Sequence, residues 1–219
     1  MFSFIIFLSI LPFIYLLTQQ VYVGGILYAV GNVAGLIGAV LMMWQVVLGM
    51  RFISHKIRPD LIRNTKLHIF LGTYGLVLVF VHPILQLVKY GWELATNFDF
   101  RDPFYSNVNW GKLAITIFLL TWITSALFRK KIAYRYWLMI HYLNYFMILF
   151  VFLHARNLGT FIAHFEWVTI YFNSLFLLFL SIVTFRIARF LNIGKIKFSL
   201  VSKTNVTNEV VRYEFRNVG

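Results

Sequence analysis

Long apolar runs are the feature that most constrains this chain. Each run is about 20 residues long, enough for a helix to cross a hydrocarbon core of about 30 Å. We therefore expect an all-α membrane protein, a bundle of six transmembrane helices. The runs predict the six helices near residues 2–18, 22–49, 65–89, 109–128, 134–156 and 165–190.

Composition excludes several classes of function. The chain is 60% hydrophobic and only 12% charged, and a soluble domain would carry more charge. Its net charge is +13, but the basic residues form short clusters between apolar runs, so we expect no nucleic-acid partner. There is no cysteine, which excludes iron–sulfur clusters and thiolate metal sites. A redox metal would be held by histidine, methionine or carboxylate.

The basic clusters predict the orientation in the bilayer. They lie in the loops near 50–66 and 129–135 and after the sixth helix, all on one face. That face is expected to be cytoplasmic, which places both termini in the cytoplasm of a multi-pass protein of the bacterial plasma membrane. The first run lacks a basic start and a small-residue cleavage site, so it is expected to be a retained helix.

Four histidines lie inside predicted membrane helices. His68 and His82 belong to the third helix, and His141 and His154 to the fifth. Ionisable residues at membrane depth are functional candidates. A single histidine would more often be a hydrogen-bonded residue of the bundle, but two on each of two helices favour metal ligation.

The spacing of these histidines predicts two haem sites. Fourteen residues separate His68 from His82, and thirteen separate His141 from His154. Both separations correspond to roughly 20 Å along a helix. Since the third and fifth helices run in the same direction, His68 is expected to pair with His141 on the cytoplasmic side, and His82 with His154 on the external side. Two stacked b-type haems would then lie one above the other.

The two helices differ in regularity. Gly72 and Gly75 fall in the same stripe as His68 and His82, and they either leave room for a porphyrin or serve close helix packing. On the fifth helix, thirteen residues do not return to the same face. That helix is therefore distorted, or the haems meet it from different sides. The residues between its histidines are either bundle core or a bridge between the haems: Tyr145, Phe146, Met147 and Phe150.

The remaining histidines are weaker candidates. His55 lies in a basic loop and is expected to be solvated. His164 begins the sixth helix and is an alternative external ligand or part of an acceptor site.

The pattern of apolar and polar residues changes after about residue 195. Residues 196–219 alternate apolar and polar side chains around a turn, which predicts two short strands. Two strands are not a stable unit alone. We expect residues 1–195 to form the membrane domain and 196–219 to begin a cytoplasmic β domain that continues beyond this sequence.

The pattern resembles the ferric reductase transmembrane domain superfamily, which includes NADPH oxidases. The resemblance covers roughly residues 20–195 and is carried by the histidine pairs and by the stretches Leu67–Gly72 and Val81–Pro83. It implies an NAD(P)H-dependent oxidoreductase in which FAD of the adjoining domain passes electrons through two haems to an external acceptor. Oxygen, giving superoxide, or ferric iron would be that acceptor. This sequence lacks the flavin and nicotinamide motifs, and the second helix has no arginine in its external half, which weakens the oxidase interpretation.

Two alternatives remain open. The chain could be a haem subunit fed by quinol or flavin that reduces a periplasmic partner. It could also be a transporter whose histidines line a path. A proton relay needs acidic partners, and the predicted spans contain no Asp or Glu except Glu166 at the start of the sixth.

Overall fold

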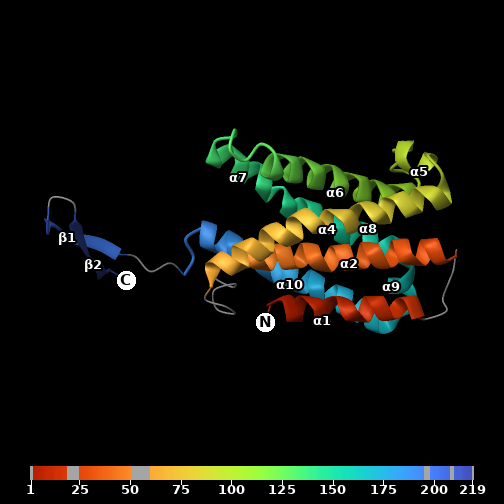
Figure 1. Ribbon diagram of the computed structural model, residues 1–219, viewed down its shortest axis with the longest axis horizontal. Helices are drawn as coiled ribbons and strands as arrows, with labels where there is room; N and C mark the ends of the chain where they lie inside the picture. The colour runs from red at the N-terminus through yellow and green to blue at the C-terminus, as the bar shows by residue number, and fades with distance from the viewer. Residues whose placement is uncertain (1, 19–24, 51–59, 195–197, 208–209, 219) are drawn as a thin grey trace. The chain divides into compact units, whose positions relative to one another are not determined.

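The computed structural model describes residues 2–18, 25–50, 60–194, 198–207 and 210–218, and these residues are mostly helical (Figure 1). His55 lies outside the described residues. The elements are α1 Phe2–Tyr15, the 3₁₀ turn η1 Leu16–Thr18, α2 Ile26–Gly49, α4 Leu61–Tyr90, α5 Glu93–Thr96, α6 Pro103–Ala126, α7 Tyr134–Tyr142, α8 Asn144–Leu158, α9 Thr160–His164, α10 Glu166–Phe190, β1 Phe198–Asn205 and β2 Val211–Asn217.

Four helical segments of the described chain are long and apolar enough to cross a membrane: α2, α4, α7 with α8, and α10. On α4, the side chains of Val77, Ile84 and Val88 are more than half exposed. An apolar surface of this kind suits lipid rather than water. The chain is therefore an integral membrane protein. Helix α1 is shorter, and α6 carries polar residues among its 24, so the expectation of six spans remains a prediction.

Two helices begin earlier than their apolar runs because aspartates cap them. The Asp60 carboxylate accepts a hydrogen bond from the Arg63 backbone N–H at 3.0 Å, and α4 starts at the next residue. The Asp102 carboxylate accepts from the Tyr105 N–H at 2.8 Å, and Pro103 occupies the first turn of α6. These caps place the helix starts at 61 and 103, not near 65 and 109.

Small residues bring α2 against α4. Gly31, Ala34 and Gly38 are all buried on α2, and small side chains let two helix backbones approach closely in a membrane. Figure 1 shows α2 and α4 running side by side. Helices α6 and α8 form a second pair, tied by a hydrogen bond of 2.8 Å from the Thr121 hydroxyl to the Asn144 side-chain carbonyl.

The fifth expected helix is interrupted at one residue. Leu143 separates α7 from α8, and its N–H donates to the Ile140 carbonyl three residues earlier at 3.0 Å. The Asn144 side chain donates to the His141 carbonyl at 2.9 Å. A tightened turn of this kind changes the rotation between the residues on its two sides. The fifth helix is therefore locally distorted between its two histidines.

The chain divides into two compact units, Met1–Phe179 and Leu180–Gly219. In the second unit, β1 and β2 pair antiparallel, from Phe198 opposite Asn217 to Asn205 opposite Val211. The register shifts between Leu200 and Ser202, which is the mark of a bulge.

Candidate functional site

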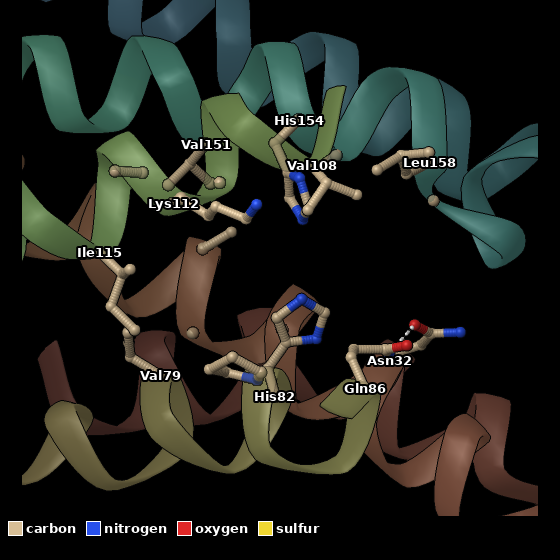
Figure 2. A pocket seen from close by; sticks show the side chains of 18 of the residues that line it. Asn32, Val79, His82, Gln86, Val108, Lys112, Ile115, Val151, His154 and Leu158 are labelled. Carbon is tan, nitrogen blue, oxygen red and sulfur yellow. Dashed lines mark hydrogen bonds between the residues drawn. The ribbon is translucent and has the colours of Figure 1, made fainter. Parts of the chain in front are cut away.

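One pair of histidines faces a cavity in the first unit. The imidazole rings of His82 and His154 have centroids 5.9 Å apart. Figure 2 shows them pointing toward each other from opposite sides of a cavity. The volume of this cavity is about 470 Å³. That volume is in the range of small-molecule and cofactor pockets. Apolar side chains dominate the lining, among them Val79, Ile115 and Val151. We call this the 82/154 pair.

A second pair has almost the same geometry. The ring centroids of His68 and His141 are 6.1 Å apart, and we call these the 68/141 pair. One metal–imidazole bond of about 2 Å on each side, added to the radius of each ring, gives a centroid separation of roughly 6 Å. Both pairs are therefore spaced so that one metal ion fits between the two rings.

Backbone carbonyls fix the orientation of three of these rings. The Nδ1 atoms lie within hydrogen-bond distance of carbonyl oxygens: His82 with Gly31 at 2.9 Å, His154 with Asn107 at 3.0 Å, and His68 with Gln45 at 3.1 Å. A carbonyl only accepts, so Nδ1 carries the proton and donates. The lone pair is then on Nε2, which is the tautomer a metal ligand requires.

His141 is oriented by aromatic stacking. Its ring lies 4.9 Å from the ring of Trp137 at an interplanar angle of 22°. The Trp137 indole N–H donates to the Ser125 hydroxyl at 3.1 Å, and the Arg129 guanidinium lies 4.4 Å from the Trp137 ring on α7. This stack restricts rotation of the His141 imidazole.

These residues fit a haem. Among the described residues, no group of three or more His, Cys, Asp or Glu gathers to bind a bare metal ion. Paired imidazoles suit an iron whose other four ligands come from a porphyrin. The 82/154 cavity is mainly apolar, and glycines stand beside both of its histidines, Gly35 on α2 and Gly111 on α6. The apolar lining suits a flat apolar macrocycle, and the glycines leave room for the two imidazole rings.

The glycines of α4 and the residues between the histidines of the fifth helix have different neighbours in the structure. A Cβ on Gly72 would lie 3.5 Å from the Gln45 side chain, so Gly72 faces α2, whereas a Cβ on Gly75 would meet no atom within 4 Å. Met147 is buried and lines the cavity. Phe150 instead stacks on Trp110, with ring centroids 5.2 Å apart.

The hydrogen bond of His164 differs from those of the paired histidines. Its Nδ1 donates to the Thr160 carbonyl of its own helix α9 at 2.9 Å. Among the described residues, the cavity-lining set contains His154 and not His164.

Sequence reasoning missed Lys112. This lysine follows Gly111 on α6 and lines the cavity (Figure 2). Its ammonium donates to the Asn97 carbonyl and lies 4.4 Å from the centroid of the Phe98 ring. The signal was present in the sequence, because a lysine inside an apolar run is a functional candidate by default.

The sequence profile of one protein family matches more than half of the chain. It is the ferric reductase like transmembrane component, and it covers residues 34–152. The chain belongs to this family. The matched segment contains His68, His82 and His141, and His154 follows two residues after it. Neither a curated protein nor a solved structure matches the chain.

Membership in the ferric reductase-like family makes the chain the membrane component of an oxidoreductase, and it suggests transmembrane electron transfer. The resemblance drawn from the histidine-bearing stretches of the sequence is confirmed by this match.

Proposed function

We propose that this ferric reductase-like chain transfers electrons across a membrane through two b-type haems. The 68/141 pair would hold one haem and the 82/154 pair the other. The observation that carries this proposal is the recurrence of one geometry: two imidazole pairs with centroids 6.1 Å and 5.9 Å apart, both joining α4 to the α7–α8 segment. A bound haem supplies an iron that cycles between the ferric and ferrous states.

The chain's own residues position these groups and exclude water. Hydrogen bonds from Nδ1 hold three imidazoles, and Trp137 holds the fourth. The mainly apolar lining of the 82/154 site would limit contact of a bound haem with water, which favours electron transfer over reactions with solvent. His82 and His154 would hold the haem of this site, and that group would supply an electron to an external acceptor.

The direction of transfer follows from the charge pattern. Three basic clusters on one face would put the 68/141 pair on the cytoplasmic side and the 82/154 pair on the external side, in a bundle of six spans. Electrons would enter from NAD(P)H through FAD in a cytoplasmic module. They would leave to oxygen or ferric iron outside.

The C-terminal hairpin supports a flavin module. Phe198 and Phe215 on β1 and β2 are each about 60% exposed, and a two-stranded hairpin with apolar side chains in solvent is not a stable unit. We propose that this hairpin joins the sheet of a flavin-binding β domain. A haem subunit fed by quinol has no need of such a hairpin.

An absorption spectrum of the detergent-purified protein tests the proposal. We expect sharp low-spin bands on reduction with dithionite, two b-type haems per chain by pyridine haemochrome, and no binding of carbon monoxide. Protein that carries no haem after expression with ample haem supply would overturn the proposal and favour the transporter interpretation instead.

Lys112→Gln is expected to lower the midpoint potential of the haem at the 82/154 pair. Reduction adds a negative charge, so a nearby cation favours the ferrous state. A unit charge within about 10 Å contributes on the order of 1–2 kcal/mol at an effective dielectric constant of about 20. A redox titration of both haems measures the shift. Lys112→Arg keeps the charge and should keep the potential, and an equal shift in both variants would show that the charge has no role.

A further inference from the structure

Each carbonyl that accepts from Nδ1 of a histidine of the two pairs already belongs to a helix. Gly31 and Gln45 lie on α2, and Asn107 lies on α6. A helical carbonyl normally accepts from the N–H four residues later, but its oxygen has a second lone pair. An outside donor reaches that lone pair only if nothing covers it. In an α-helix, the side chain four residues later points back over this turn and covers it.

In all three cases the residue four positions later is glycine. Gly35 follows Gly31, Gly49 follows Gln45, and Gly111 follows Asn107. Two of these positions have no room for a side chain. A Cβ on Gly35 would lie 2.8 Å from Nδ1 of His82, and a Cβ on Gly111 would lie 2.8 Å from Nδ1 of His154. At Gly49 a Cβ would lie 3.7 Å from Cε1 of His68, which is ordinary contact.

The arrangement on α2 repeats with the period of the histidines. Gly31 and Gln45 are fourteen residues apart, as are His82 and His68 on the antiparallel helix α4. Fourteen residues are close to four helical turns, so both carbonyls and both glycines face α4. Helix α2 thus meets each histidine of α4 with one carbonyl and one glycine.

We propose that Gly35 and Gly111 are positioning residues for the haem at the 82/154 pair, an inference that rests on the proposed function. By leaving the Gly31 and Asn107 carbonyls open, they let Nδ1 of His82 and His154 donate. This bond fixes the tautomer that presents Nε2 to the cavity and makes the imidazole a stronger electron donor to iron. A stronger donor stabilises the ferric state, so the bond lowers the midpoint potential of that haem.

Gly35→Ala and Gly111→Ala in the full chain test the proposal. Each methyl group displaces the imidazole from its carbonyl. We expect either the loss of one haem per chain, or its retention with a raised midpoint potential and a changed low-temperature electron paramagnetic resonance signal. The haem at the 68/141 pair should keep its spectrum and potential, which shows that the protein is folded.

Ile37→Val is the matched control, because Ile37 lies on α2 two residues after Gly35 and is not among the described residues that line the cavity. It should keep both haems and both potentials. Wild-type spectra and potentials in Gly35→Ala and Gly111→Ala would overturn the inference. Loss of both haems in them, or an equal change in Ile37→Val, would also overturn it, since the glycines would then serve helix packing. A wild-type protein without haem would instead refute the proposed function itself.

Discussion

His82→Ala is expected to remove one of the two proposed haems and leave the other. The His82 ring is half of the 82/154 pair, and Figure 2 shows it facing His154 across the cavity. Alanine leaves only one axial ligand in that cavity. Haem quantification by pyridine haemochrome should fall from two per chain to one. A redox titration should then show a single step with the potential of the haem at the 68/141 pair.

His164→Ala is the control for this prediction. His164 is a histidine ten residues after His154, but its Nδ1 donates to the Thr160 carbonyl of its own helix α9. It should retain both haems. If His164→Ala lost one haem and His82→Ala lost none, the pairing of His82 with His154 would be wrong as a ligand assignment.

The sequence predicted the helices well where apolar residues alone determine them. The expected helices at 22–49 and 165–190 correspond to α2 and α10 within a few residues. The starts of α4 and α6 were placed four to six residues late. Their first turns are polar and are held by capping aspartates, so hydropathy alone does not extend to them. Asp102 followed by Pro103 was a readable signal for a helix start.

The hydrogen-bond partners of the histidine rings could not be predicted. Histidine periodicity along one chain indicates which side chains share a depth, and the structure brings those side chains together in pairs. The acceptors of their Nδ1 protons are backbone carbonyls, which every residue has and no sequence pattern marks. Gly35 and Gly111 carry a signal only after one knows which helix lies against which histidine.

The distorted fifth helix shows the same limit. Thirteen residues between His141 and His154 indicated either a distortion or two different faces. The structure has a break at Leu143, where Asn144 bonds to the His141 carbonyl and accepts from Thr121 of α6. An asparagine inside an apolar run marks such a place, but its partner on another helix decides the outcome.

His141→Ala is expected to abolish electron transfer across the membrane while one haem remains. The 68/141 and 82/154 pairs lie about fourteen and thirteen residues apart on their helices, so the two haems would act in series. Loss of either then interrupts the whole path. Proteoliposomes with ferricyanide trapped inside measure this directly when dithionite is added outside. The wild-type chain should reduce the trapped ferricyanide, and His141→Ala should fall to the rate of protein-free vesicles.

Met139→Ala provides the matched control on α7. Its side chain is 62% exposed on the helix that carries His141, so its loss tests the helix without the ligand. It should transfer electrons at the wild-type rate. If His141→Ala kept that rate with one haem lost, the remaining haem would carry electrons alone, and a path through two haems in series would be wrong. If it kept both haems, His141 would not be a ligand, and the stacking of its ring on Trp137 would serve only the packing of α7.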